Sequence, residues 1–301
     1  MRKPCLFVVL LLGSSLLAGQ QATTGHPNEI AFMTDFGLLD DSVAICKQVM
    51  YNLDPTVRIL DISHEVTPFS ILDGARYLEG MSDYVPQGTV FVAVIDPGVG
   101  TSRKAIVAKS KKGNYYVLPD NGLLTYVQNH EGIEAVRVIT NPGWMLGNAI
   151  SSTFHGRDIF SPVGAHLARG ENWTEVGPEM PASELERLTL SEPAIVNGAL
   201  RAQVIGTDGP FGNLITNVDG EEFARLGYKY GDTLHLTLGG REFEMPFVKT
   251  FGDVAIGGPL AFIDSRGRLS LSLNQANFAR TYNIKPPVDL SIPEKKSATG
   301  H

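Results

Sequence analysis

Residues 89–103 read TVFVAVIDPGVGTSR, an apolar run that ends in an acid, a Pro-Gly turn and an arginine. The run from Thr89 to Ile95 is typical of a strand buried on both faces, as strands of parallel sheets are. In an open α/β sheet, ligands bind beyond the carboxyl ends of the strands. Asp96 and Arg103 therefore fall where a site is expected. Asp-Pro-Gly is equally an ordinary turn sequence, so this stretch alone leaves both interpretations open.

Strand and helix patterns alternate on both sides of this stretch. Alternation at this spacing favours βαβ units and a mainly parallel sheet. After about Leu190 the pattern changes to short strands of alternating polarity, joined by turns such as Gly239-Gly240, which predicts an antiparallel β domain. In the first part the expected strands are 29–34, 57–62, 89–95, 105–109, 115–118 and 135–139, and the expected helices are about 40–53, 69–81 and 157–167.

These patterns predict an α/β protein of two domains. Residues 28–187 form the expected N-terminal α/β domain, with a mainly parallel central sheet. Residues 193–292 form the expected C-terminal domain, an antiparallel and barrel-like β structure. Residues 180–193 are the expected linker, and the polar tail 294–301 is expected to be disordered.

The N-terminus has the layout of a secretory signal peptide over residues 1–22. Arg2 and Lys3 precede an apolar run at residues 5–12, and small residues follow at Ala18-Gly19. We therefore expect a secreted or periplasmic protein without a stable membrane anchor, with an uncleaved anchor as the alternative. Cleavage leaves Cys46 as the one cysteine of the mature chain, on the apolar face of a predicted helix, where a buried structural thiol is expected.

Composition and motifs exclude several classes of function. The 301 residues are 43% hydrophobic and 19% charged, as in globular proteins. A net charge of −7 and the lack of a basic stripe argue against nucleic-acid binding. The chain contains no HExxH, paired CxxC, GxGxxG or GxxxxGK[ST] motif, so we expect neither a metal site nor a bound cofactor.

Polar, glycine-rich loops follow several of the predicted strands, and functional residues concentrate on such loops. Among the histidines, His155 is a stronger site candidate than His64, and His166 is expected to be structural. Asp120-Asn121-Gly122 is a strong turn signal, which favours a structural role there. The loops are 34–37, 96–103, 119–122 and 153–158 in the first domain and 207–213 and 264–267 in the second.

Taken together, these loops carry a family resemblance that covers about residues 30–273. Its motifs are TDFG at 34–37, DDS at 40–42, VTPF at 66–69, DGARY at 73–77, DPGVGTSR at 96–103, PDNGLLT at 119–125, TFHGRD at 153–158, DGPFGN at 208–213 and SRG at 265–267. With these motifs in this order, the chain resembles the S-adenosylmethionine (SAM) hydroxide adenosyltransferases. Their relatives, fluorinase and chlorinase, attack the same substrate with halide.

The resemblance implies hydrolysis of SAM to adenosine and L-methionine, by attack of an activated water or hydroxide on ribose C5′. In the water-using members an acid, an arginine and a histidine surround the attacking oxygen, and these roles fall on Asp96, Arg103 and His155. The halogenases carry tyrosine at the position of Asp96 and threonine at that of Val99. They also have a long insertion after this loop, which is missing here. These departures favour water as the nucleophile.

The resemblance also implies substrate contacts from both domains and a homotrimer. Each site would lie between the first domain of one subunit and the second domain of a neighbour. SAM is the expected substrate, and no cofactor is implied. The implied contacts are Asp35 with the ribose hydroxyls, Phe69 with the sugar or adenine, Asn213 and Phe251 with adenine, and Asp208, Ser265 and Arg266 with the methionine amine and carboxylate.

Two alternatives stay open at this stage, and an export signal motivates the first because SAM is made in the cytosol. The protein could be a periplasmic binding protein for SAM or adenosine that performs no turnover. It could also be a hydrolase or halogenase that acts on a related adenosyl compound. The presence of Asp96, Arg103 and His155 together favours an enzyme.

Overall fold

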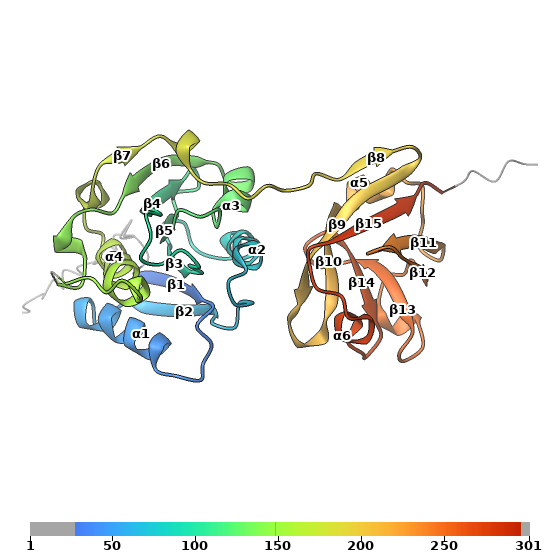
Figure 1. The fold of residues 1–301 in the computed structure, drawn as a ribbon, viewed down its shortest axis with the longest axis horizontal. Helices are drawn as coiled ribbons and strands as arrows, with labels where there is room; N and C mark the ends of the chain where they lie inside the picture. The colour runs from blue at the N-terminus through green and yellow to red at the C-terminus, as the bar shows by residue number, and fades with distance from the viewer. Residues whose placement is uncertain (1–27, 148, 296–301) are drawn as a thin grey trace, which may run out of the picture.

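The computed structural model describes residues 28–147 and 149–295. The predicted signal peptide and most of the polar tail lie outside these residues. Figure 1 shows two bodies, each built around its own sheet, joined by an extended segment before β8. The expected class, α/β with an antiparallel barrel-like C-terminal part, is confirmed.

The N-terminal sheet is mixed, with the strand order β2-β1-β3-β5-β4-β6-β7. Parallel pairs join β1 to β2, β1 to β3 and β3 to β5, whereas β4 runs antiparallel to β5 and β6. Its strands are β1 (Glu29–Thr34), β2 (Arg58–Ser63), β3 (Val90–Val94), β4 (Ala105–Ser110), β5 (Tyr115–Pro119), β6 (Ile133–Val138) and β7 (Glu179–Met180). Its helices are α1 (Ser42–Leu53), α2 (Ile71–Ser82), α3 (Thr125–His130), η1 (Pro142–Trp144), η2 (Gly156–Phe160), α4 (Ser161–Ala168), η3 (Trp173–Val176) and η4 (Ala182–Glu184).

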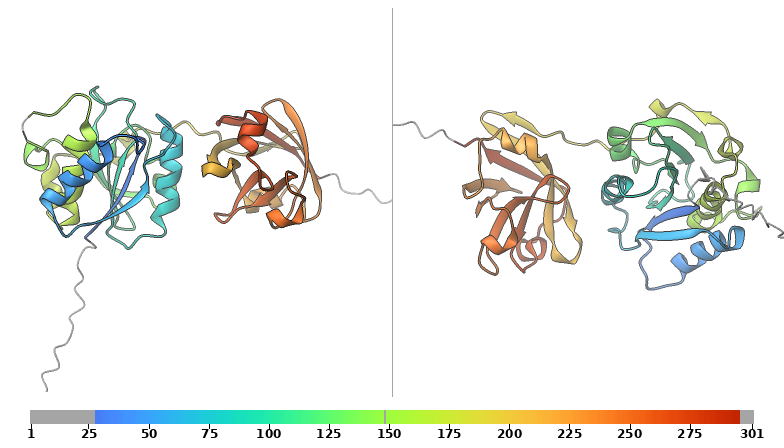
Figure 2. Two further views of the ribbon diagram at one scale, coloured as in Figure 1. Left: turned by 90° about the horizontal axis from the view of Figure 1, so that it is seen from below. Right: turned by 180° about the vertical axis from the view of Figure 1, so that it is seen from behind.

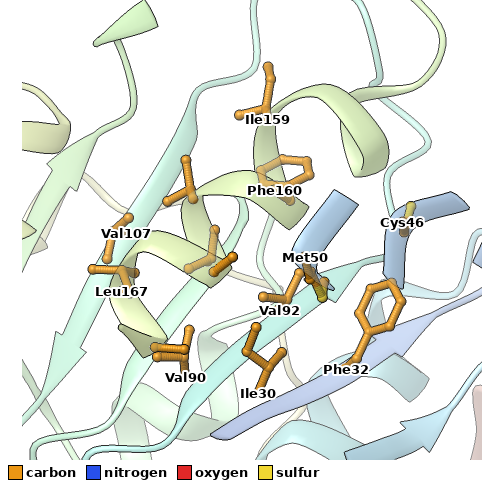
Figure 3. Packing of buried hydrophobic residues seen from close by; sticks show 14 of the residues in the cluster. Ile30, Phe32, Cys46, Met50, Val90, Val92, Val107, Ile159, Phe160 and Leu167 are labelled. Carbon is orange, nitrogen blue, oxygen red and sulfur yellow. The ribbon is translucent and has the colours of Figure 1, made fainter. Parts of the chain in front are cut away.

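Helices cover both faces of this sheet, which explains why β1 and β3 are continuous apolar runs. Successive side chains of a strand point to opposite faces. Ile30 and Val92 therefore pack under α1 and α4, as Figure 3 shows, whereas Ala31 and Phe91 pack on the other face with Leu78 of α2. The buried central strands bring their carboxyl ends to one edge of the sheet, where the candidate loops begin.

The C-terminal sheet is antiparallel and curls toward closure. Its order is β12-β11-β15-β9-β10-β14-β13, with β8 paired to β9, and a bridge between Phe247 and Ala261 links its two ends. Its strands are β8 (Ala194–Val196), β9 (Ala199–Asp208), β10 (Asn213–Asp219), β11 (Thr233–Leu238), β12 (Arg241–Pro246), β13 (Pro259–Ile263), β14 (Arg268–Leu273) and β15 (Val288–Pro293). Its helices are η5 (Gly209–Phe211), α5 (Gly220–Ala224), η6 (Phe251–Asp253) and α6 (Phe278–Tyr282).

The helix expected at 157–167 is interrupted: a π-helical turn, η2, precedes α4. Pro162 has no N–H to donate to the carbonyl of Asp158, and the N–H of Leu146 takes that carbonyl instead, at 2.8 Å. Single π-turns often occur at functional sites. This one begins directly after His155.

Candidate active site

Asp96 and Arg103 form a buried ion pair at the end of β3. Arg103 Nε donates to both carboxylate oxygens of Asp96, at 2.9 and 3.0 Å, and its Nη2 adds a further bond to Oδ2. The Arg103 side chain is only 10% exposed and the Asp96 side chain only 4%. The guanidinium also lies over the Phe160 ring, 5.2 Å from its centre. The Pro-Gly turn thus brings the two charges of the stretch together, as the sequence predicted.

His155 completes this cluster through the same guanidinium. Arg103 Nη2 lies 2.7 Å from His155 Nδ1. A guanidinium can only donate hydrogen bonds, so Nδ1 is the acceptor and the imidazole carries its proton on Nε2. Burial, followed by the charge of Arg103, lowers the pKa of His155 below its ordinary value of 6.5. His155 is therefore a neutral hydrogen-bond donor in this arrangement.

Contacts between loops fix the positions of these three groups. Gly100 has a φ of +74°, and a side chain there would strike the carbonyl of Ser152, so the two loops meet backbone to backbone. Asp158, which is 1% exposed, accepts a hydrogen bond from the N–H of Ser151 at 2.7 Å. Asn121 Nδ2 donates to the carbonyl of Ile95, one residue before Asp96, at 2.9 Å. Asn121 thus has the structural role that its turn motif indicated. The role of Asp158 was missed, although it is the last residue of the TFHGRD motif.

Asp35 and Phe69 are brought together by a hydrogen bond from the Phe69 N–H to Asp35 Oδ2, at 2.8 Å. Phe69 has a φ of +65°, a strained conformation for a bulky residue that recurs at ligand sites. The residue is 73% exposed. Phe69 precedes helix α2 instead of beginning it, because Ser70 caps the helix by accepting from the Asp73 N–H.

A cavity of about 220 Å³, the N-terminal cavity, lies between these loops. Ligand pockets that enclose a whole drug-sized molecule measure about 300–1,000 Å³, so this cavity has room for only part of such a ligand. Arg103 is not one of its lining residues but is bonded to two of them, Asp96 and His155. The lining residues that matter here are Asp35, Phe69, Asp96, Val99 and His155.

The five site residues predicted in the second domain line a different and larger cavity, of about 1,100 Å³, here called the C-terminal cavity. Asn213 is buried and is held by Ser272 Oγ, which donates to its side-chain oxygen. Phe251 packs on Phe262, with ring centres 5.0 Å apart. The five predicted residues are Asp208, Asn213, Phe251, Ser265 and Arg266.

Asp264 organises the turn that carries Ser265 and Arg266. Its Oδ1 accepts from the N–H groups of Arg266 and Arg268, at 2.9 and 3.0 Å, and its Oδ2 accepts from Ser270 Oγ. Arg266 is an exposed residue, and within residues 28–147 and 149–295 its guanidinium has no hydrogen-bond or ion-pair partner. The turn therefore presents a free cation. From the sequence, Asp264 was placed in a candidate loop but given no role, although it directly precedes the SRG motif.

The predicted site residues thus form two groups, each around its own cavity. The two cavities have no lining residue in common. Beside the N-terminal cavity, Asp96 is paired with Arg103, which also bonds His155, whereas Arg266 of the C-terminal cavity has no such partner among the described residues. A single ligand that contacts both groups would have to bridge the two cavities.

Other candidate residues have structural contacts. His64 is buried, with Nδ1 2.9 Å from Thr34 Oγ1, and His166 Nδ1 lies 2.8 Å from Glu171. Burial raises the pKa of the Cys46 thiol to about 11, which keeps it protonated. In the described parts of the chain, no group of three or more His, Cys, Asp or Glu side chains could hold a metal ion, and no helix is long and apolar enough to cross a membrane.

Comparison with protein families gives matches in both domains. Residues 30–177 match the family model of the SAM hydroxide adenosyltransferase N-terminal domain. Residues 202–290 match the family model of the corresponding C-terminal domain. The two matches lie on either side of the linker and include every predicted site residue.

Similar proteins include both hydrolases and halogenases. The (R)-S-adenosyl-L-methionine hydrolase of Salinispora tropica is 37% identical over 85% of this chain and 94% of its own length. The fluorinase of an Actinoplanes species is 35% identical over 87% of this chain and 96% of its own. A crystal structure of an uncharacterized conserved protein from Thermotoga maritima is 38% identical, with a TM-score of 0.83 over 88% of this chain and 99% of that one.

Proposed function

Because the chain belongs to the SAM hydroxide adenosyltransferase family, we propose that it hydrolyses SAM to adenosine and L-methionine. Curated relatives that are similar over most of their length are named (R)-SAM hydrolases. Fluorinases are similar to this chain to a comparable degree, so overall similarity does not distinguish water from halide as the nucleophile. The single observation that carries the choice of water is the Asp96–Arg103–His155 cluster beside the N-terminal cavity.

The chemistry needs an activated nucleophile and no acid for the leaving group. The C5′–S bond of SAM breaks to release methionine as a neutral thioether, while an O–C5′ bond forms and water loses one proton. Because His155 Nδ1 accepts from Arg103, its proton lies on Nε2, where it can orient the oxygen. Asp96 is then the acceptor for the proton, and Arg103 stabilises the hydroxide-like charge that develops.

The same geometry disfavours a halide as nucleophile. A halide is an anion without protons, so it can donate no hydrogen bond to the Asp96 carboxylate and would be repelled by it. Water can donate one of its protons to that carboxylate while its oxygen faces C5′. Val99 lines the N-terminal cavity with an apolar side chain where the halogenases have a hydroxyl.

We place the complete site between neighbouring copies of the chain, in a homotrimer. The N-terminal cavity is too small for all of SAM, and the C-terminal cavity shares no lining residue with it. Phe69 at the first cavity and Phe211 at the second are 73% and 67% exposed. Aromatic rings exposed at a concave site are suited to being covered by a ligand or a partner. In this arrangement Asp35 and Phe69 bind the ribose side of the substrate.

The C-terminal cavity of the neighbouring copy then binds the two ends of the substrate. Asn213 and Phe251 contact the adenine, and aromatic stacking suits a purine. Arg266 pairs with the methionine carboxylate, and Asp208 with the amine, with Ser265 as a further donor. Opposite charges on one cavity wall match a zwitterionic amino acid. We further propose that residues 1–22 direct export of the protein from the cytosol. Cell fractionation of the tagged full-length chain tests this localisation.

The test is the product and the origin of its oxygen. Purified protein is incubated with each sulfur epimer of SAM in oxygen-18 water, with chloride or fluoride added in parallel. We expect methionine and adenosine in equal amounts, with oxygen-18 at the 5′ position, and turnover of the (R) epimer. Bound but unreacted SAM would favour a binding protein, and a 5′-halogenated nucleoside would favour a halogenase.

A further inference from the structure

Helix α2 carries a glycine where the guanidinium of Arg266 rests on it. A Cβ atom built on Gly80 would lie 2.5 Å from Arg266 Nη1 and 2.8 Å from its Cζ. Real Cβ atoms do not approach other atoms so closely, so any larger residue at position 80 would displace the guanidinium. Gly80 has no positive φ, and no turn requires it. The helix interior normally disfavours glycine relative to alanine.

The surrounding contacts hold this face of α2 against the C-terminal domain. Arg76, buried and paired with Asp73, donates to the carbonyl of Thr207 at 3.3 Å. Glu79 pairs with Arg268 at 3.4 Å. In Figures 1 and 2, α2 lies on the side of the N-terminal domain that faces the C-terminal domain. The helix therefore contacts both the strand end before Asp208 and the turn that carries Arg266.

We propose that Gly80 is a positioning residue for Arg266. Because Gly80 has no side chain, the Arg266 guanidinium can pack against the helix backbone. This contact holds the guanidinium at the wall of the C-terminal cavity and leaves its N–H donors free for a ligand. Asp264 fixes the backbone of the same turn, so the contact with Gly80 restricts the remaining freedom of the side chain. Preorganising a donor in this way strengthens ligand binding because less side-chain entropy is lost.

This inference rests on the proposed function, in which Arg266 binds the carboxylate of SAM. It makes a prediction that a structural role for Gly80 would not make. Gly80→Ala improves helix propensity, and the atoms displaced are the far end of a flexible side chain. Stability should therefore stay constant or rise, with Tm up by about 2 °C, while binding weakens.

The experiment is a double-mutant cycle on ligand binding. Calorimetry measures Kd for S-adenosyl-L-homocysteine, which keeps both ends of SAM but has no sulfonium to be attacked, and for adenosine, which lacks the amino acid. The proteins are the wild type, Gly80→Ala, Arg266→Ala and the double variant. We expect Gly80→Ala to weaken S-adenosyl-L-homocysteine binding about tenfold in the wild-type background and less than about twofold in the Arg266→Ala background. Adenosine affinity should stay constant throughout.

Each other outcome contradicts a defined part of the account. An equal loss in both backgrounds, or a matching loss for adenosine, would show that Gly80 does not act through Arg266. Unchanged binding in Gly80→Ala would also overturn the inference while leaving the proposed function intact. A wild-type protein that binds neither ligand would overturn the proposed function and the inference with it.

Discussion

The two cavities differ in how their charges are satisfied. At the N-terminal cavity Asp96, Arg103 and His155 are bonded to one another, and folding alone assembles them. At the C-terminal cavity Arg266 is an exposed residue, and its guanidinium is supported by Gly80 without a charged partner among the described residues. A buried charge without a partner is strongly destabilising, so it must be paired in the free protein. An exposed charge is solvated by water and can stay unpaired until a ligand binds. On the proposed function, the first cavity carries the reacting groups together with the ribose contacts, and the second binds the two ends of the substrate.

Replacing Arg103 should have the largest effect, because it removes the partner of both other groups. We expect Arg103→Ala to lower kcat by about 10²–10⁴-fold, and to destabilise the fold by about 3–5 kcal/mol because Asp96 is left as an unpaired buried charge. His155→Ala should lose a similar amount of activity. Adenosine binding should survive in part in both variants. Methionine release under single-turnover conditions measures the effect, and near-normal rates in both variants would remove this cluster from the mechanism.

Replacing Arg266 should affect binding instead of chemistry. Arg266→Ala should raise KM for SAM about 10–100-fold, with kcat changed only a few fold and Tm unaffected. Arg225, an exposed arginine at the end of α5, supplies the matched control, and Arg225→Ala should leave both constants unchanged. If Arg266→Ala lowered kcat as Arg103→Ala does, the division between the two cavities would be wrong.

The fall of activity at low pH tests the hydrogen bond between Arg103 and His155 at the N-terminal cavity. The pKa of His155 is lowered, chiefly by burial and then by Arg103, so the imidazole is neutral above a pH that lies below 6.5. Activity should be present above this pKa and be lost as the pH falls through it, because a protonated Nδ1 cannot accept from Arg103. NMR titration of His155 should show that Arg103→Ala raises this pKa. A pKa that stays constant or falls in the variant would contradict the contact.

The smallest effect is expected at a residue that only supports the first cavity. Asn121→Ala removes the hydrogen bond to the Ile95 carbonyl beside Asp96. We expect a loss of about 1 kcal/mol in stability and a few-fold decrease in kcat, with KM unchanged. Denaturant unfolding and steady-state kinetics measure these two quantities. A loss as large as that of Arg103→Ala would indicate a direct role in the reaction.

Much of the fold could be predicted from the sequence because it depends on local patterns of polarity and on turn motifs. The run at 90–95 is apolar at every position since helices cover both faces of its sheet, and the pairing of Asp96 with Arg103 follows from a short turn. The bond from Arg103 to His155 joins residues 52 apart in sequence, so only tertiary packing shows it. In the π-turn after His155, the N–H of Leu146, which is distant in sequence, bonds the Asp158 carbonyl that Pro162 leaves free.

The assembly of the C-terminal cavity was predictable in part. Its residues were identified by motif. The contact of Arg266 with Gly80, however, forms where the two domains pack together, and no local pattern encodes that packing. Strand β15 was not among the expected strands, because it follows Pro286-Pro287 and ends on Pro293, and proline argues against a central strand; Leu290 and Ile292 within it are nevertheless buried. The separation of the site residues into two cavities likewise depends on how the chain is arranged in space.

Mixing two defective chains tests most directly whether one site is built from both cavities on neighbouring copies. Chains carrying Arg103→Ala and chains carrying Arg266→Ala are refolded together and assayed at SAM concentrations far below KM. With random assembly, about a quarter of the sites combine an intact N-terminal cavity with an intact C-terminal cavity, so about a quarter of wild-type activity should return. If mixing restored nothing while size analysis showed mixed oligomers, each site would lie within a single chain, and the account would be contradicted.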